Sequence, residues 1–472
     1  MLLMVTIGYV FSYLIPTKQK SVVFPIQSTQ AFFIAQSGVE FAVRLAKDNG
    51  WTSKGSLNTN FNTAPNNTRT LGPGTGIGSF LLSYSSSTDT LTSAGQVPTG
   101  TERRRIVVSN FSTFLSYYSY VMPITVNANQ VSNNVTLTNF PMLVNITANN
   151  NLRTVANGGN IASYNAATGD PQDLIFEGLD DTTCGGVAGS SPCKLSHEIE
   201  LYGPTTGALI AWVNVPSITS TATGTGDTVI YMYYGNGCMS ATTQNPGGVW
   251  ANYSGVWHSG NSATPLTDST GNNNLATNST QVAGQIGFAQ SYNGTSQLAS
   301  KTAGVVNIPA NNASQTISVW FSLAAGDYNT RSGVSFVNGT NSGLQFGQRN
   351  SGTTSRAVGF WQWGGNFLGG TQTNPTAATW HYMVYTFDGT THRPYFDGAA
   401  LATATTPAAQ TGTPSQIYFS TYDGTDERWS GGIDEVRISI SSIVRSANWI
   451  ATEYNNQSAP GTFYTLGAQQ NN

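Results

Sequence analysis

The pattern of apolar and polar positions divides the chain into a short helical beginning and a long β region. Residues 1–15 (MLLMVTIGYVFSYLI) carry no charged side chain, and residues 28–48 repeat apolar side chains at helical spacing. After residue 51, short runs alternate between apolar and polar positions and end at Gly, Asn, Asp or Pro. That alternation is typical of antiparallel strands with one buried face. The sequence predicts a mostly β protein with an N-terminal α-helix.

The apolar segment 1–15 is shorter than the roughly 20 residues that a bilayer span requires. A secretory signal has basic residues in front of its apolar run, whereas Lys18 and Lys20 follow it here. We therefore favour an assembly helix, with a trimmed signal peptide as the alternative. The side chains predicted to form this assembly helix are Leu2, Leu3, Val5, Ile7, Val10, Phe11, Leu14, Ile34 and Phe41.

The segment 28–48 (STQAFFIAQSGVEFAVRLAKD) has two apolar stripes and a narrow polar face. Glu40 and Arg44 are spaced to pair across one helical turn. A helix that is apolar on two sides packs against two partners. We expect its own β head on one side and a neighbouring subunit on the other, which predicts a homo-oligomeric filament.

The β region contains repeated strand signals from residue 117 onward. The segment WHYMVYTFDGTTHRPYFDG (380–398) is the strongest, because two alternating runs flank an Asp-Gly turn and a second Asp-Gly pair follows. The sequence predicts β-sandwich (jelly-roll) architecture. The expected domains are an N-terminal helix over 1–50, a small sheet over 51–115, a β-sandwich over 116–255 and a jelly roll over 256–472.

Charge is scarce in this chain. Charged residues make up 9% of the 472 residues and the net charge is −3, so no basic field exists to attract nucleic acid. A surface covered by hydroxyls and amides suits an extracellular protein. Cys184 and Cys193 bracket a short Gly/Ser-rich stretch, and a disulfide between them is plausible in an oxidising compartment.

We find no catalytic constellation in the sequence, so we expect a protein that is not an enzyme. Asp434 and Glu435 are adjacent on a predicted strand, and neighbouring side chains on a strand face opposite ways. They therefore do not form the carboxylate pair of a glycosidase. The histidines are scattered, and His381 is interpreted as a packed structural residue.

Trp361 and Trp363 alternate in GFWQWGGNF, so both side chains are predicted on one face of a strand. Exposed aromatic faces beside amides and carboxylates form the usual sugar-contacting set. Tyr422, Asp423 and Trp429 are candidates to contribute from a loop. The alternative is that these aromatic residues belong to the sandwich core, as we expect for Trp320 and Trp380.

The run AFFIAQSGVEFAVRLA resembles the N-terminal helix of bacterial type IV pilin-like proteins, especially large minor pilins. Residues 78–111 (GSFLLSYSSSTDTLTSAGQVPTGTERRRIVVSNF) resemble the three-stranded sheet of that family. The chain departs from the family at Val5, where a Glu is usual. The resemblance implies a subunit that resides in the inner membrane before it assembles into a pilus at the cell surface.

Residues 117–255 resemble a bacterial surface domain of unknown function, and the rest resembles a laminin-G/concanavalin A-like module. The segments that carry the second resemblance are GVWHSG, DSTGNNN, FAQSYNG, QTISVWFSL and GGIDEVRISI. In such modules an Asp of the DSTG loop and the Asp of the DEV strand often lie near a structural metal. The resemblance therefore implies a Ca²⁺ site at Asp268 and Asp434. The alternative is that Asp268 closes a turn with its own backbone and Asp434 caps a strand end.

These features together predict a subunit of an extracellular, pilus-like filament. It would polymerise through its N-terminal helix and display lectin-like β domains for adhesion to surface glycans. The competing hypothesis is a non-polymeric adhesin or lectin tethered to the membrane by its N-terminus. A secreted glycosidase is disfavoured because the sequence lacks a suitable acid pair.

Overall fold

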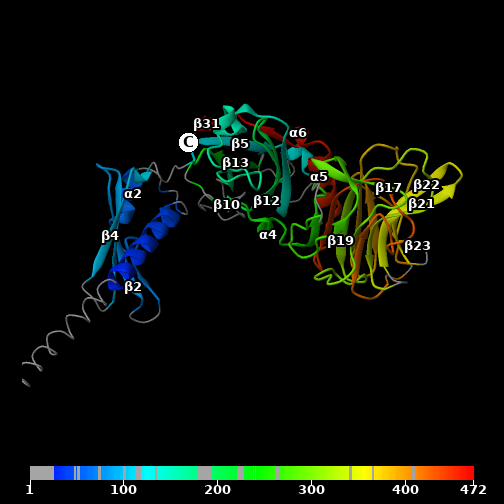
Figure 1. The fold of residues 1–472 in the computed structure, drawn as a ribbon, viewed down its shortest axis with the longest axis horizontal. Helices are drawn as coiled ribbons and strands as arrows, with labels where there is room; N and C mark the ends of the chain where they lie inside the picture. The colour runs from blue at the N-terminus through cyan, green and yellow to red at the C-terminus, as the bar shows by residue number, and fades with distance from the viewer. Residues whose placement is uncertain are drawn as a thin grey trace, which may run out of the picture. The chain divides into compact units, whose positions relative to one another are not determined.

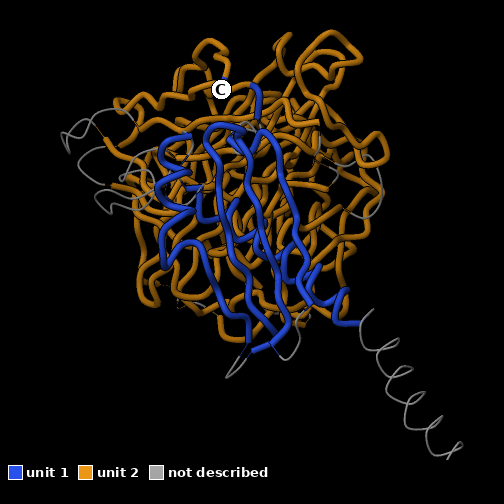
Figure 2. The backbone as a smooth tube through the Cα atoms, turned by 90° about the vertical axis from the view of Figure 1, so that its left-hand side faces the viewer, with its two compact units in different colours: residues 1–119, 189–193, 472 blue, residues 120–188, 194–471 orange. Residues whose placement is uncertain are grey.

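The computed structural model describes residues 26–46, 49, 51, 54–72, 76–98, 102–112, 118–132, 136–178, 193–220, 228–237, 239, 241–260, 266–339, 343–363, 366–406, 408 and 410–472. The chain divides into two compact units, one comprising residues 1–119, 189–193 and 472 and the other residues 120–188 and 194–471 (Figure 2). The fold is mostly β with an N-terminal helix, as predicted.

The first unit contains a helix over residues 26–46, the helix α2 (Lys54–Phe61) and one antiparallel sheet (Figure 1). The sheet has the order β1-β2-β3-β4, with strands at Thr68–Leu71, Gly78–Ser85, Thr90–Gln96 and Arg103–Ser109. The helix at 26–46 approaches β3 closely, because a Cβ at Gly95 would lie 2.3 Å from the Ala31 carbonyl oxygen. Only glycine leaves room for this contact.

The helix at 26–46 packs on its own sheet through Ile34 and Phe41, which were predicted to serve assembly. Ile34 is buried, and the Phe41 ring lies 5.4 Å from that of Phe80 on β2. Apolar burial against β2 and β3 therefore uses these two side chains within the subunit. The other predicted assembly residues lie outside the described residues: Leu2, Leu3, Val5, Ile7, Val10, Phe11 and Leu14. Among the helices that the structure describes, none has the length and apolar character needed to cross a bilayer.

The second unit begins with two sheets that form the first sandwich. One has the order β10-β9-β13-β5-β30, with β31 also pairing β5, and its strands are Cys193–Leu195, Ile175–Gly178, Val229–Tyr234, Tyr120–Val126, Tyr464–Leu466 and Gln470–Asn471. The other has the order β11-β12-β6, with strands His197–Gly203, Ala208–Ile218 and Leu137–Ile146. Short elements complete this part of the chain: β7 (Tyr164–Asn165), β8 (Asp170–Pro171), η1 (Ala128–Gln130), η2 (Asn150–Leu152), η3 (Val155–Asn157) and α4 (Pro246–Val249).

The jelly roll follows as two packed antiparallel sheets. The first has the order β16-β17-β29-β19-β25-β26-β27 with β14 beside β29, and its strands are Thr280–Ala283, Phe288–Asn293, Ser430–Ser439, Gln315–Phe321, His381–Phe387, His392–Phe396, Ala399–Ala400 and Tyr253–Trp257. The second has the order β15-β18-β28-β20-β21-β22-β23 with β24 beside β22, and its strands are Ala276–Thr277, Ala299–Lys301, Gln416–Phe419, Arg331–Val337, Gly343–Gly352, Ser355–Gln362, Asn366–Phe367 and Gln372–Thr373.

The predicted hairpin at 380–398 is confirmed, because β25 pairs with β26 and β26 pairs with β27. Asp397 and Gly398 at the second turn both have positive φ angles, which two-residue hairpins require. His381 is buried, and its Nδ1 lies 2.9 Å from a carboxylate oxygen of Asp397. That contact ties the two strands together, as a structural histidine would.

The chain returns from the jelly roll to the first sandwich at its C-terminal end. After α5 (Ala447–Ser458) and α6 (Pro460–Phe463), β30 pairs with β5, and the Asn456 amide hydrogen-bonds both backbone groups of Leu143 on β6. We expected this segment to belong to the jelly roll at 256–472. Its pairing with β5 joins both sandwiches within the second compact unit.

Candidate functional site

An open cavity of about 300 Å³ lies on the β21–β22 side of the jelly roll. Its lining residues are Gln345, Arg349, Trp361, Gln362, Trp363, Tyr422 and Glu427. Val358 and Phe360 of β22 pack in the apolar core. The alternation of a strand therefore turns Trp361 and Trp363 to the opposite face. Both tryptophans line this cavity, where Trp361 is 1% exposed and Trp363 is half-buried, and their role as sugar contacts stays a prediction.

Aromatic and charged groups inside the cavity hold one another in place. The Arg349 guanidinium carbon lies 4.8 Å from the centre of the Trp361 ring, and the Trp363 and Tyr422 rings lie 5.2 Å apart. Ser332 Oγ donates to Glu427 Oε2 at 2.8 Å and lies 3.2 Å from Gln345 Oε1. The cavity thus combines ring faces with amide, guanidinium and carboxylate groups.

The remaining predicted sugar contacts lie elsewhere. Trp429 is fully buried in the jelly-roll core, where its ring packs on Phe321 and Phe346. It was predicted to contribute from a loop, but it lies directly before β29 with its ring turned into the core. Asp423 does not line the cavity, and its Oδ1 accepts hydrogen bonds from the backbone N–H groups of Thr425 and Asp426.

The two predicted calcium ligands have different partners. The Asp268 carboxylate accepts the backbone N–H groups of Val256, Thr270 and Asn273, which is the alternative that we considered for it. Asp434 is fully buried on β29, and its Oδ2 accepts the backbone N–H of Ile286 at 3.1 Å. A Ca²⁺ site formed by this pair stays a prediction.

Of the two cysteines in the predicted disulfide, one lies within the described residues. Cys193 is disulfide-bonded, whereas Cys184 lies outside the described residues. The pairing of Cys184 with Cys193 therefore stays a prediction.

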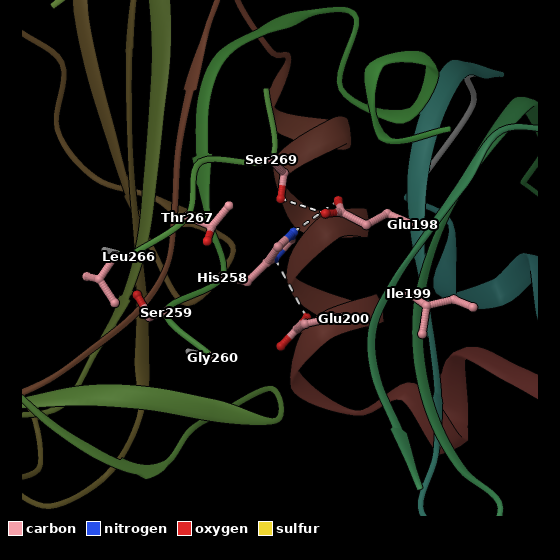
Figure 3. Close-up of a pocket in the computed structure, with 9 residues that line it drawn as sticks. All are labelled: Glu198, Ile199, Glu200, His258, Ser259, Gly260, Leu266, Thr267 and Ser269. Carbon is pink, nitrogen blue, oxygen red and sulfur yellow. Dashed lines mark hydrogen bonds and ion pairs between the residues drawn. The ribbon is translucent and has the colours of Figure 1, made fainter. Parts of the chain in front are cut away.

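A second cluster of polar side chains is buried between the first sandwich and the jelly roll. We call it the carboxylate cluster. Its members are Glu198 and Glu200 of β11, His258 after β14, Asp434, Glu435 and Arg437 of β29, and Glu453 of α5. A cavity of about 190 Å³ reaches Glu198, Glu200 and His258 (Figure 3).

His258 lies at the centre of the carboxylate cluster. Its Nδ1 is 2.8 Å from Glu435 Oε1 and 3.6 Å from Glu200 Oε2, and its Nε2 is 3.3 Å from Glu198 Oε2. Figure 3 shows Glu198 and Glu200 projecting from β11 toward the imidazole. Among the described residues, Glu200, His258 and Glu435 are a group whose ligand atoms all lie within 4.8 Å of one another, as a metal site requires.

The positive charge of Arg437 is paired with two carboxylates of the carboxylate cluster. Its guanidinium lies 2.5 Å from Glu435 Oε2 and 3.1 Å from Glu453 Oε1. The same group lies over the Trp212 ring, 4.1 Å from its centre. The charged groups are therefore enclosed by aromatic rings and by each other, with little contact with water.

β-bulges direct the glutamates into this cluster. The β11–β12 register shifts between Ile199 and Leu201, and the β19–β29 register shifts between Ser318 and Trp320, opposite Glu435. Glu435 has a φ of +50°. A bulge inserts one residue and re-aims its side chain.

The bulge in β29 corrects the expectation that Asp434 and Glu435 face opposite ways. Ile433, Val436 and Ile438 pack in the jelly-roll core. With the extra residue at Glu435, the two consecutive carboxylates both lie on the outer face of the sheet. The rule that neighbouring side chains on a strand face opposite ways failed here, because it holds only where two strands pair without a bulge.

Burial and like charge shift the acidity of this cluster. Burial, together with the nearby Glu435 charge, raises the pKa of Glu200 to about 8. Burial and the charges of Glu435 and Glu200 also raise the pKa of Asp434 well above its usual range. Burial opposes charge on His258, but Glu435 and Glu198 outweigh it and raise its pKa. The cluster thus holds more acidic groups than its two cationic side chains can compensate.

Sequence reasoning did not identify Glu198, Glu200, His258 or Arg437 as site residues. One signal was available: charged residues are rare in this chain, yet HEIELY and IDEVR place several within apolar strands. Such residues are buried only when they are paired. Their meeting depends on three distant segments, which the sequence pattern did not connect.

The comparison with protein families matches residues 293–451 to the concanavalin A-like lectin/glucanases superfamily. The chain matches none of the curated proteins. The match covers β18 to the first turn of α5, and thus most of the jelly roll.

Solved structures resemble the chain at low identity. Domain 4 of AbnA, an extracellular GH43 arabinanase from Geobacillus stearothermophilus in complex with arabinotriose, is 18% identical over 43% of this chain and 98% of that chain, with a TM-score of 0.34. The receptor binding domain of botulinum neurotoxin mosaic serotype C/D is 14% identical over 44% of this chain and 51% of that chain, with a TM-score of 0.32. The chain thus spans about half the length of that toxin domain. Residues 293–451 carry a concanavalin A-like domain.

Proposed function

We propose that this chain is a non-catalytic carbohydrate-binding adhesin, displayed at the bacterial surface as a subunit of a pilus-like filament. The observation that carries this proposal is the aromatic cavity formed by Trp361, Trp363 and Tyr422 on the jelly roll. Its volume of about 300 Å³ is at the lower end of the volumes typical of small-ligand sites, about 300–1,000 Å³.

The chemistry of the cavity suits a sugar. The half-buried Trp363 and Tyr422 rings offer apolar faces to the C–H groups of a pyranose or furanose. Arg349 and Gln345 line the cavity and bring guanidinium and amide donors for sugar hydroxyls. A small number of fixed polar groups beside apolar walls is the usual composition of a specific small-ligand site.

The buried carboxylates do not offer a hydrolytic alternative. The side chains of Glu200 and Glu435 are 5% and 0% exposed, and the rings of Trp212 and Trp250 lie against the same cluster. The cavity that reaches Glu200 measures about 190 Å³, below the roughly 300–1,000 Å³ of typical small-ligand sites, so it is small for a polysaccharide chain. This supports a binding function for the jelly roll rather than a glycosidase.

Replacing Trp363 by alanine should weaken carbohydrate binding at least about tenfold, because it removes a ring face that would contact the sugar. A tenfold loss corresponds to about 1.4 kcal/mol of binding free energy. The purified second unit would first be screened on an array of bacterial, plant and animal oligosaccharides. The best ligand would then be titrated by calorimetry. Phe288→Ala is the matched control, since Phe288 is an exposed aromatic residue that does not line the cavity. Equal affinity of the wild-type and Trp363→Ala proteins would reject this site.

Assembly is proposed from the N-terminal unit. Phe32 and Phe33 are 46% and 60% exposed on the helix whose other side packs on β2 and β3. Exposed aromatic residues on an already packed helix favour a protein partner, and a neighbouring copy is the partner that we propose. Before assembly, the apolar segment 1–15 would reside in the inner membrane.

Removal of residues 1–15 should convert the assembled protein into a soluble monomer. Each large apolar side chain buried between subunits contributes about 1.5–3 kcal/mol, so losing the segment removes most of the association energy. Negative-stain microscopy of material sheared from cells, with light scattering of the truncated protein, measures this. Filaments formed by the truncated protein would contradict the proposal. A full-length protein found only as single copies in membranes would favour the tethered adhesin.

A further inference from the structure

We infer that Glu200, His258 and Glu435 form a binding site for a divalent transition-metal ion, which ties the first sandwich to the jelly roll. This site is independent of the proposed carbohydrate cavity and differs from the calcium site predicted at Asp268 and Asp434. The ligands would be Nδ1 of His258 and one carboxylate oxygen each from Glu200 and Glu435.

The spacing of the three ligand atoms fits such an ion. His258 Nδ1 lies 2.8 Å from Glu435 Oε1 and 3.6 Å from Glu200 Oε2. Zn²⁺ binds nitrogen and carboxylate ligands at about 2.0–2.2 Å, so tetrahedral ligand atoms lie about 3.4 Å apart. The observed distances lie on either side of that value. All three ligand atoms lie within 4.8 Å of one another, so side-chain rotations would bring them around one ion.

The second nitrogen of His258 has the partner that a metal-binding imidazole usually has. Its Nε2 lies 3.3 Å from Glu198 Oε2, and the other oxygen of Glu198 accepts the Ser269 hydroxyl at 2.7 Å. The Trp250 indole also donates to Glu198. A carboxylate that accepts this N–H leaves the Nδ1 lone pair free for the metal and fixes the ring orientation. Trp212 Nε1 similarly donates to Glu200 at 2.9 Å.

The backbone presents the two carboxylate ligands at irregular positions. Glu200 occupies the register shift in β11, and Glu435 occupies the one in β29. β-bulges are over-represented beside functional sites because they re-aim a side chain. Two bulges that direct glutamates from different sheets toward one imidazole are difficult to explain by strand packing alone.

Two unpartnered polar groups at the cluster point independently to a missing ligand. Within the described part of the chain, Ser259 Oγ and Asp434 Oδ1 are buried without hydrogen-bond partners. Ser259 is 4% exposed and lines the same 190 Å³ cavity as Glu200 and His258. Buried polar atoms are normally satisfied. An ion with a bound water in the cavity would provide partners for such atoms.

Charge favours a cation over a neutral ligand. The cluster contains the carboxylates of Glu198, Glu200, Asp434, Glu435 and Glu453 but only the cationic groups of Arg437 and His258. A histidine ligand disfavours Ca²⁺, which takes oxygen ligands. Imidazole with carboxylates suits Zn²⁺ or Mn²⁺. We therefore expect one of these ions rather than Ca²⁺.

The test is metal binding by the purified full chain. The protein is stripped with a chelator, dialysed separately against Zn²⁺, Mn²⁺ and Ca²⁺, and analysed by elemental mass spectrometry and thermal unfolding. We expect about one equivalent of Zn²⁺ or Mn²⁺ per chain, no Ca²⁺ bound at this site, and a higher Tm of the metal-loaded protein. No retained Zn²⁺ or Mn²⁺, or no change in Tm upon loading, would overturn the inference.

Matched variants identify the site. Glu200→Gln keeps the size of the side chain and an acceptor for the Trp212 indole, and it should weaken metal binding by at least about tenfold. Glu177→Gln on β9 makes the same change outside the cluster and should bind like the wild type. Unchanged binding by Glu200→Gln would refute the assignment. If that variant does not fold, as judged by circular dichroism, His258→Gln takes its place. If neither variant folds, paramagnetic NMR of the Co²⁺-loaded wild type decides. A Co²⁺-bound histidine gives a strongly shifted, exchangeable ring N–H signal, and the absence of that signal would reject the site.

Discussion

Replacing Trp429 by alanine is expected to destabilise the jelly roll by about 3–5 kcal/mol, the usual cost of deleting a fully buried aromatic side chain. Trp429 is 0% exposed, and its ring packs on Phe321 and Phe346. The loss has two parts, the transfer of apolar surface and the cavity that the rigid sheets leave open. Urea denaturation of the purified second unit, followed by tryptophan fluorescence, measures the change.

The same variant separates the core from the carbohydrate cavity. Trp363→Ala is the matched comparison, because Trp363 is half-buried and should cost about 1 kcal/mol of stability while losing sugar affinity. Trp429→Ala should show the reverse, with lower stability and retained affinity under conditions where it is folded. A stable Trp429→Ala protein with lost affinity would mean that the ring contacts the ligand after all.

Replacing Arg437 by methionine is expected to cost about 3–5 kcal/mol when the protein is kept in chelator, because it leaves buried carboxylates without a counter-charge. Arg437 is 1% exposed and pairs with Glu435 and Glu453. Methionine keeps much of the volume over the Trp212 ring, so the charge is the main loss. Equilibrium denaturation of the two proteins measures the difference.

A double variant tests whether charge is the cause. Adding Glu453→Gln to Arg437→Met removes one uncompensated carboxylate and keeps an acceptor for the Tyr382 hydroxyl. The double variant should therefore be more stable than the two single effects predict, by about 0.5–3 kcal/mol, the range for groups in direct contact. Strict additivity would mean that the loss at Arg437 comes from packing on the tryptophans.

The aromatic cavity and the carboxylate cluster differ in how much of each could be predicted from the sequence. The pairing of Trp361 with Trp363 in one cavity was predicted, because Trp361 lies at the end of β22, Trp363 directly follows that strand, and the period of a strand is local. Trp429 and Asp423 were also proposed but do not line the cavity. Their side-chain directions depend on how the loop 420–429 enters β29, which residue spacing does not encode.

The sequence by itself determined the helix at 26–46, the alternating strands and the Asp-Gly hairpin between β25 and β26, because each depends on residues within a few positions of one another. Only the tertiary structure decided the return of β30 to β5 and the meeting of Glu200, His258 and Glu435. Those contacts join segments that are far apart in the chain. Their register is set by packing and by bulges, and a bulge reverses the side-chain phase that the local pattern predicts.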